Sequence, residues 1–448
     1  MLDQSTASAL SAALVERALR AGADACDATC SGSMSEGVTI RLGELEDVER
    51  SESEEASLRV FVGQRSASIS STDLSDAALD DLATHAVAMA RAAPEDRYAG
   101  LAPVELLTSP PFEDFDLFDE TDVTPEDLRQ SAEDVEESAL AIAGVTNSEG
   151  ASASRSEGIF ALATSHGFQA SRRGRHFGLS VSVIAGEGAD KERDYAYRQT
   201  RHVEDLPSAA ELGALAGERA VAKLGSGRMK GGRIPVILDP RVGSGLLSYL
   251  VSAINGAAIA RRSSFLLGKL DEQVFAPGIR IVDDPHRQRG LRSRAFDAEG
   301  LPTARSNLVE DGRLTGWLMA SAAARQLGLA PTGHASRSGS GSPSASASNV
   351  HLEPGSATPE ELMADVAHGL YVTSLIGHGV NPVTGDYSQG AVGFRIENGE
   401  RAGPVSELTV AGNLLDMFAA LVPANDLEFK NSVNVPTIRM DCLTVAGQ

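Results

Sequence analysis

Glycines and polar side chains are concentrated in one stretch near the C-terminal end of the sequence, between a β-branched apolar run and a later strand. Asparagine, threonine and aspartate alternate there with glycine more densely than a turn requires. Because well-specified loops between strands often carry binding residues, we expect this loop to line a cleft for a substrate or partner. Each glycine taken singly is equally compatible with an ordinary turn. The expected cleft residues are Gly377, His378, Gly379, Asn381, Thr384, Asp386, Tyr387 and Ser388.

Regular elements on both sides should position this loop. The apolar segment before it predicts a buried strand. After it, two further strands flank Asn398-Gly399, a pair that favours a tight hairpin. Asn413 is then suited to cap a final helix. The expected segments are the strands 371–376, 391–397 and 405–410 and the helix 414–421.

The other chemistry-bearing residues do not form a recognisable motif. Four histidines in the C-terminal half show no metal-ligand spacing. The run Asp283-Asp284-Pro285-His286 is more typical of a strand-ending Asx turn than of a ligand set. A nucleophilic serine would need a strained elbow between a strand and a helix, whereas the serine- and glycine-rich segment 335–347 predicts a flexible loop. The four histidines are His334, His351, His368 and His378.

Composition limits the classes of function. A formal net charge of −23 over 448 residues argues against a nucleic-acid-binding surface. The N-terminal segment lacks the features of a signal peptide, and no run of about 18 apolar residues predicts a membrane span. Three cysteines without an export signal fit reduced thiols. We therefore expect a cytoplasmic protein without nucleic-acid or membrane partners.

Helical and strand patterns occur twice in the N-terminal half. A helix, several short strands and a second helix precede a proline- and acid-rich connector, and a similar series follows it. Glycines such as Gly150, Gly158, Gly167 and Gly174 are expected to separate the strands. The expected organisation is a first α+β unit at 1–93, a connector at 94–123, a second α+β unit at 124–225 and a C-terminal domain at 226–448.

The C-terminal half predicts a strand at 234–238, a helix at 242–260 and a hairpin around Asp311-Gly312. Together with the strands near the polar loop, these elements favour a mostly antiparallel, barrel-like β domain. The expected fold class is α+β, with two N-terminal helix-plus-antiparallel-sheet units before this β domain.

Several long segments of the sequence resemble one family. GLYVTSLIGHGVNPVTGDYSQGA at 369–391, FRIENGE at 394–400, PVSELTVAGNL at 404–414, RAFDAEGLPT at 294–303 and the Thr332-Gly333 segment are similar to the PmbA branch, also called TldE, of the TldD/PmbA family. The resemblance runs in order from about residue 20 to the C-terminus. It implies a two-subunit metallopeptidase that acts on peptides, earlier described as a modulator of DNA gyrase.

The resemblance also marks where this chain departs from the metal-bearing branch. In TldD-type chains the helix matching 242–260 carries a His-Glu-x-x-x-His motif that binds zinc and supplies a general base. Here Ser248 and Ala253 align with the histidines and Tyr249 with the glutamate, and 242–270 contains no histidine or glutamate. The TldD-type cysteine ligand would fall near 430–433, where there is none. The resemblance thus implies no catalytic residue, metal ligand or cofactor in this chain, with zinc in the partner.

Three hypotheses of function follow. The first is a subunit that completes the cleft of a TldD-like, zinc-bearing partner in a heterodimer and helps to hold an unfolded peptide, by strand addition for instance. The second is a homodimeric binding or scaffold protein without peptidase activity. The third is a hydrolase that uses a site not evident in the sequence.

Overall fold

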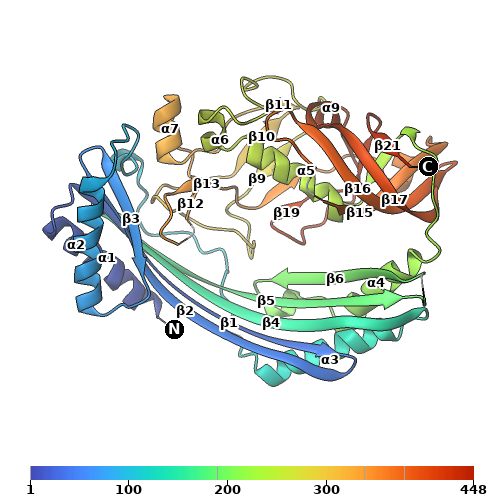
Figure 1. The fold of residues 1–448 in the computed structure, drawn as a ribbon, viewed down its shortest axis with the longest axis horizontal. Coiled ribbons are helices and arrows are strands. Elements are labelled where there is room, and N and C mark those ends of the chain that lie inside the picture. Colours follow the sequence, from blue (N-terminus) through green and yellow to red (C-terminus); the bar gives the residue numbers. More distant parts are fainter. Residues whose placement is uncertain (1, 189, 338, 378, 448) are drawn as a thin grey trace.

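The computed structural model describes residues 2–188, 190–337, 339–377 and 379–447. A long, strongly curved sheet forms the N-terminal half, and the C-terminal domain lies over its concave face (Figure 1). The α+β fold class expected from the sequence is confirmed. None of the helices in these ranges is both long and apolar enough to cross a membrane.

The N-terminal sheet is a single six-stranded antiparallel sheet in the order β3-β2-β1-β4-β5-β6. Strands β1 and β4 pair along almost their whole length, from Asp27 opposite Thr164 to Ile40 opposite Ala151. The two expected α+β units therefore share one sheet. Its strands are β1 (Ala25–Arg41), β2 (Glu44–Val62), β3 (Arg65–Ser71), β4 (Val145–Thr164), β5 (Gln169–Ala185) and β6 (Glu192–Thr200).

The expectation of short strands separated by glycines was wrong for most of this sheet. Strands β1, β2, β4 and β5 run for 17 to 20 residues. Gly158 and Gly174 lie opposite each other within paired strands, and Gly150 (φ 115°) lies at a register shift. Gly167 (φ 92°) is a true turn residue between β4 and β5. A glycine in a β-rich sequence can therefore lie inside a strand, at a bulge or where another group approaches closely, and need not mark a turn.

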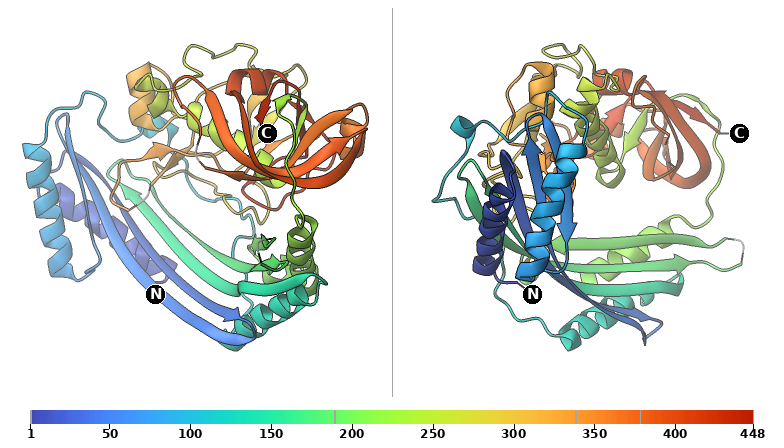
Figure 2. Two further views of the ribbon diagram at one scale, coloured as in Figure 1. Left: turned by 45° about the vertical axis from the view of Figure 1, so that its right-hand side comes forward. Right: turned by 60° about the vertical axis from the view of Figure 1, so that its left-hand side comes forward.

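Helices cover the convex face of the sheet. In α1 and α2, apolar residues such as Leu14 and Leu79 pack against Leu58 and Val60 of β2. Helices α3 and α4 pack against the other end of the sheet, where Val135 meets the apolar side chains of β5. Figure 2 shows α1 and α2 on the side of the sheet away from the C-terminal domain. These elements are α1 (Gln4–Arg20), α2 (Asp76–Ala92), α3 (Pro125–Leu140) and α4 (Ala209–Ala222), with short 3-10 turns η1 (Val104–Leu106) and η2 (Val203–Asp205).

The C-terminal domain contains a curled eight-stranded sheet in the order β18-β20-β8-β15-β16-β17-β21-β7, in which only the β8–β15 pair is parallel. A five-stranded sheet, β11-β10-β9-β14-β19, lies beside it. The strands are β7 (Gly232–Arg233), β8 (Val236–Leu238), β9 (Ile281–Asp283), β10 (Ser306–Glu310), β11 (Arg313–Leu314), β12 (Ala335–Ser336), β13 (Ser344–Ala345), β14 (Val350–Leu352), β15 (His368–Ile376), β16 (Asp386–Glu397), β17 (Glu400–Asn413), β18 (Val422–Pro423), β19 (Val433–Asn434), β20 (Ile438–Met440) and β21 (Thr444–Ala446).

Two local expectations in this domain were wrong. The helix expected at 242–260 breaks after Ala253, because Asn255 leaves the helix and caps a new one through the backbone N–H of Ala257. The segment expected as a flexible loop at 335–347 contains the short β12–β13 pair. The helices of the domain are α5 (Pro240–Ala253), α6 (Gly256–Ala260), α7 (Ser321–Leu327), α8 (Pro359–Met363) and α9 (Leu414–Ala419).

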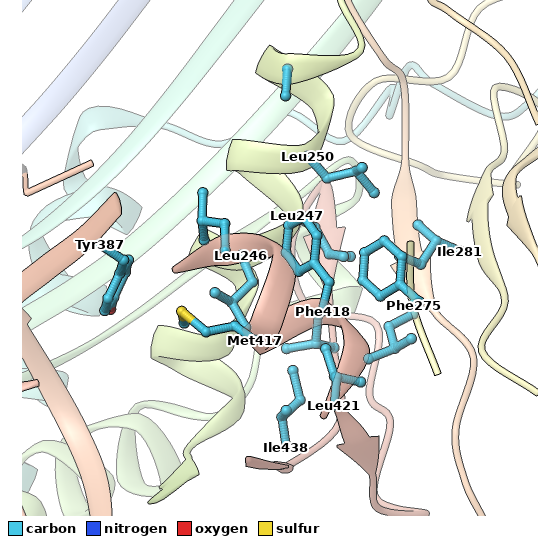
Figure 3. Close-up of a cluster of buried hydrophobic side chains, with 14 of the residues drawn as sticks. Leu246, Leu247, Leu250, Phe275, Ile281, Tyr387, Met417, Phe418, Leu421 and Ile438 are labelled. Atoms are coloured by element: carbon cyan, nitrogen blue, oxygen red, sulfur yellow. The ribbon is translucent and has the colours of Figure 1, made fainter. Parts of the chain in front are cut away.

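The core of the C-terminal domain lies between α5, α9 and the two sheets. Figure 3 shows Leu246, Leu247 and Leu250 of α5 directed toward the Phe275 and Phe418 side chains. The two phenylalanine rings stack with centroids 4.3 Å apart. The apolar face of α5 thus packs into this core, so the opposite face of the helix points away from the core.

Charged side chains join the C-terminal domain to the sheet at both ends. At one end, Arg337 and Arg59 share the buried carboxylate of Asp27. At the other end, Asp194 of β6 binds Arg241 of α5 (2.6 Å) and Lys223 (2.8 Å). Two of the cavities in the described part of the chain are lined by residues of both the sheet and the C-terminal domain.

Candidate functional site

The polar loop predicted from the sequence closes through its own hydrogen bonds. The side chain of Asn381 accepts the backbone N–H groups of Val383 (2.9 Å) and Thr384 (3.3 Å). Asp386 accepts the hydroxyl of Thr384 (2.6 Å) and the amide of Asn413 (3.2 Å). Three of the predicted cleft residues, Asn381, Thr384 and Asp386, therefore hold the loop conformation.

Gly379 has a similar structural role in the loop. A Cβ at this position would fall 1.4 Å from the carbonyl oxygen of Ser388, so only glycine allows the loop to approach the start of β16. The backbone N–H of Ser388 donates to the Gly379 carbonyl at 2.7 Å. Gly377 follows β15 with φ 93°. His378, the remaining predicted residue of this segment, lies outside the described residues.

The end of the loop is tied to α5 by a buried hydrogen-bond network. Tyr387, which is 3% exposed, donates its hydroxyl to Oε1 of Gln389 (2.8 Å). Nε2 of Gln389 donates to the hydroxyl of Tyr249 (3.1 Å) and to the carbonyl of Gly377 (2.9 Å). Burial, and then the neighbouring Tyr249, raise the pKa of Tyr387, so its hydroxyl stays protonated as a donor. The polar loop and α5, which the sequence analysis treated as two separate features, are thus connected by hydrogen bonds in the structure.

Sequence reasoning missed Gln389. Its position in β16 could have indicated its role. Residues two apart on a strand share a face. Gln389 lies between Tyr387 and Ala391 on such a face, and both of these residues are buried. A glutamine on a buried face needs hydrogen-bond partners, and Tyr249 is one of them.

Of the three α5 positions that the sequence resemblance aligns with a zinc motif, none has a histidine or glutamate side chain. Ser248 is exposed and donates only to the carbonyl of Ser244 (3.4 Å). Tyr249 belongs to the network with Gln389, and Ala253 is buried at the last residue of the helix. Among the residues that the structure describes, no group of three or more His, Cys, Asp or Glu side chains could hold a metal ion. The residues present here therefore do not fit zinc.

The first cavity, which we call the α5 cavity, has a volume of about 770 Å³ and lies at the N-terminal end of α5, beside β6 and α4. Its lining charges are similar in number and opposite in sign. Arg241 binds Asp194, and the guanidinium of Arg401 lies 3.4 Å from the centre of the Tyr371 ring. The cavity is lined by five basic residues, Arg198, Arg219, Arg241, Arg401 and Lys430, and six acidic residues, Asp205, Glu211, Asp239, Glu360, Asp426 and Glu428.

The second cavity, which we call the arginine cavity, has a volume of about 690 Å³ and lies between the concave face of the sheet and the C-terminal domain. Small residues of β1 and β4, such as Ser31, Ser33 and Ser156, line it on the sheet side. Its charged residues are five arginines, Arg172, Arg173, Arg201, Arg292 and Arg294, and two glutamates, Glu55 and Glu157.

One set of side chains has the order of a nucleophile, a base and an orienting acid. The hydroxyl of Thr332 lies 2.8 Å from Nδ1 of His334, whose Nε2 lies 3.0 Å from Oδ2 of Asp283. The Thr332 hydroxyl, however, also accepts the backbone N–H of Met319 (2.8 Å). His334 and Asp283 are buried, and neither cavity is lined by any of these residues. Thr332 is exposed, whereas His334 and Asp283 are buried, so the arrangement satisfies the buried polar groups of these two residues.

Comparison with known proteins decides the family. Residues 27–90, 118–224 and 231–447 match the family models for domain 1, the central domain and the C-terminal domain of the PmbA/TldA metallopeptidases. The metalloprotease PmbA of Escherichia coli O157:H7 is 37% identical over 429 residues, which cover 95% of this chain and 93% of that protein. This chain belongs to the PmbA/TldD metallopeptidase family.

Other members of the family agree with this assignment. The PmbA homologue of Haemophilus influenzae is 34% identical over 97% of this chain and 94% of its own length. A TldD homologue of the same organism is 27% identical over 60% of this chain and 61% of its own length. The crystal structure of a proposed modulator of DNA gyrase from Bacteroides thetaiotaomicron superposes with a TM-score of 0.91 at 28% identity, covering both chains completely.

Proposed function

We propose that this member of the PmbA/TldD family is the non-catalytic subunit of a two-subunit peptidase. In this proposal a TldD-like partner carries zinc and the general base, and the two chains share a cleft for an unfolded peptide. The observation that carries the proposal is α5, whose aligned positions hold Ser248, Tyr249 and Ala253. Tyr249 accepts a hydrogen bond from Gln389 where a base would be required.

The two cavities between the sheet and the C-terminal domain support a role in holding peptides. An extended peptide has unpaired backbone groups and side chains of varied size, so its site needs space and hydrogen-bonding groups more than one shaped apolar pocket. The concave face of the sheet offers hydroxyls in rows, for example Ser152 and Ser180, whose Oγ atoms are 2.9 Å apart. The loop 377–388 remains a predicted part of the cleft shared with the partner.

Strand addition is restricted at the nearest free edge. Strand β6 ends the six-stranded sheet beside the α5 cavity. Its carbonyl oxygens at Arg193 and Tyr195 already accept hydrogen bonds from Lys223 (3.1 Å) and Arg219 (3.4 Å). A peptide that paired with β6 would therefore use the last residues of the strand, near Thr200.

The test is a peptide-cleavage assay on this chain alone, on a TldD-like partner alone and on the mixture, each with and without a chelator. We expect cleavage in the mixture, none by this chain alone, and loss of activity with the chelator. Without an activated water, peptide hydrolysis is slower by many powers of ten, so this chain alone should give no detectable product. Chelator-resistant turnover by this chain alone would overturn the proposal.

The same assay separates the other candidate functions. A hydrolase that used Thr332, His334 and Asp283 would cleave without a partner and would lose activity in Thr332→Val. A homodimeric scaffold would show no cleavage in any mixture and would not co-purify with a TldD-like chain. Restoring Ser248→His, Tyr249→Glu and Ala253→His together should not create activity, because a third ligand and its supporting hydrogen bonds are also required.

A further inference from the structure

The arginine cavity carries excess positive charge within a strongly acidic chain. Its five arginines outnumber its two glutamates. Glu157 is paired with Arg175 at 2.9 Å, and Glu55 accepts a hydrogen bond from the hydroxyl of Ser57 at 3.4 Å. Of the five arginines, Arg173 is paired with Glu120 at 2.8 Å.

Four of the five arginines, Arg172, Arg201, Arg292 and Arg294, have no carboxylate partner among the described residues. Arg201 donates only to backbone carbonyl oxygens. Arg294 donates through Nη2 to the carbonyl of Ser346 (2.9 Å), while its buried Nε has no hydrogen-bond partner in the described ranges. The guanidinium of Arg172 makes no hydrogen bond or ion pair within those ranges; its closest aromatic neighbour is the ring of Phe160, 5.0 Å from the guanidinium carbon.

The positive charges of these guanidinium groups repel one another. Burial first, and then the charges of Arg294 and Arg201, lower the pKa of Arg172 to about 9. Asp297 acts in the opposite direction on Arg172, but its carboxylate already accepts three backbone N–H groups. Burial raises the pKa of Asp297, against the effect of those hydrogen bonds and of the Arg294 charge. An anionic group in the cavity would relieve this repulsion.

The sheet side of the cavity leaves room for such a group. A Cβ at Gly174 would fall 2.5 Å from Nη1 of Arg201, so glycine allows this guanidinium to lie against the strand. A Cβ at Gly158, opposite Gly174, would have no atom within 4 Å, which marks open space. The serines beside these glycines can donate hydroxyl hydrogen bonds to a ligand.

We infer that the arginine cavity binds a carboxylate group of a peptide, with Arg172 and the free Nε of Arg294 as donors. Guanidinium and carboxylate form short, paired, charge-assisted hydrogen bonds, which suits a group that has no partner in the free chain. The carboxylate can belong to the peptide C-terminus or to an acidic side chain. The identity of the ligand as a peptide rests on the proposed function, but the carboxylate preference can be tested without the partner.

The test is calorimetric titration of the full chain with three versions of one N-acetylated hexapeptide. The first has a free C-terminal carboxylate, the second a C-terminal amide and no acidic side chain, and the third the amide and one internal glutamate. We expect at least one carboxylate-bearing peptide to bind about tenfold or more tightly than the neutral amide. The first and third peptides then show which source of carboxylate the cavity prefers.

Two substitutions on the same strand provide the matched comparison. Arg172→Met should remove most of the preference for the carboxylate, and Arg172→Lys should retain part of it. Arg173→Met removes a positive charge from the same cavity, but one already paired with Glu120, and should change the preference by less than about twofold. Thermal unfolding of each variant reports whether the fold is intact.

Equal binding of the neutral amide and both acidic peptides would overturn this assignment. So would an equal effect of Arg172→Met and Arg173→Met, because that result indicates a general charge effect. Displacement of the peptide by inorganic phosphate, but not by acetate, would identify a phosphate site instead and overturn it. The cleavage assay with both subunits could give no product while peptide binding still depends on a carboxylate. That result would contradict the proposed function but not the carboxylate site.

Discussion

The two cavities between the sheet and the C-terminal domain differ in how their charges are compensated. In the α5 cavity, basic residues face acidic ones, and the buried Asp194 joins Arg241 of the C-terminal domain to Lys223 of the N-terminal half. In the arginine cavity, Arg172 and Arg294 make no ion pair among the described residues. The comparison indicates that the first set of charges holds the two bodies together, whereas the second set is available to a ligand.

The largest expected effect is at Asp194. Asp194→Asn should lower the free energy of unfolding by about 3–5 kcal/mol, because it leaves Arg241 and Lys223 without their shared, buried counter-charge. Denaturant titration measures the change. The control is Glu407→Gln, which breaks an exposed pair with Arg228 and should have almost no effect. If both substitutions cost the same, the charges of the α5 cavity do not hold the bodies together.

The same carboxylate predicts an acid dependence. Burial alone would raise the pKa of Asp194, but the hydrogen bonds and charges of Arg241 and Lys223 outweigh burial and lower it. A carboxyl group with a lowered folded pKa stabilises above its unfolded pKa of about 4 and loses this contribution as pH falls through the folded pKa. The stability difference between wild type and Asp194→Asn should therefore be full at pH 7 and shrink in acid. A difference that grows as the pH falls would contradict this assignment.

In the arginine cavity we expect a substitution that increases the free energy of unfolding. Arg172→Met should raise the free energy of unfolding by about 1 kcal/mol, because it removes a desolvated charge that has no counter-charge and keeps an apolar chain of similar length. Arg241→Met, in the other cavity, should lower it. Chemical denaturation of the two variants side by side makes the comparison, and two losses of equal size would show that the arginines of both cavities are structural.

The smallest effect is expected on α5. Tyr249→Phe removes one acceptor of the buried Gln389 amide and should cost about 1 kcal/mol, while Ser248→Ala, on the exposed side, should cost less than about 0.5 kcal/mol. Neither change should lower the rate of peptide cleavage by a complex with a TldD-like partner. A tenfold loss of rate in Tyr249→Phe at unchanged stability would make this hydroxyl part of the catalytic machinery.

Local turn chemistry was predictable from the sequence. Asn398 and Gly399 both have positive φ (53° and 87°) and connect β16 to β17 as expected for this dipeptide. Asp311 and Gly312 do the same between β10 and β11. The conformation of these turns is determined by adjacent residues, so the local sequence is enough to predict it. The loop near Asp386 was also located, although most of its predicted binding residues form its internal hydrogen bonds.

Features that depend on distant residues were not predictable. Gly158 and Gly174 resemble turn signals, but they leave space on the concave face of a strand pair. Arg172, Arg201 and Arg294 belong to segments far apart in the chain, and none of them is unusual in its local sequence. Only the packing of the C-terminal domain over the sheet brings them to one cavity and removes them from water.

The pairing of β1 with β4 has a consequence for synthesis of the chain. Strand β1 is complete at Arg41, but its second neighbour is complete only at Thr164. Until the ribosome has released that residue, a 17-residue strand keeps one edge unpaired, although β2 covers the other. Contacts of such long sequence separation form slowly, and open edges recruit other chains. We therefore expect a nascent chain paused in the connector to aggregate more readily than the complete chain.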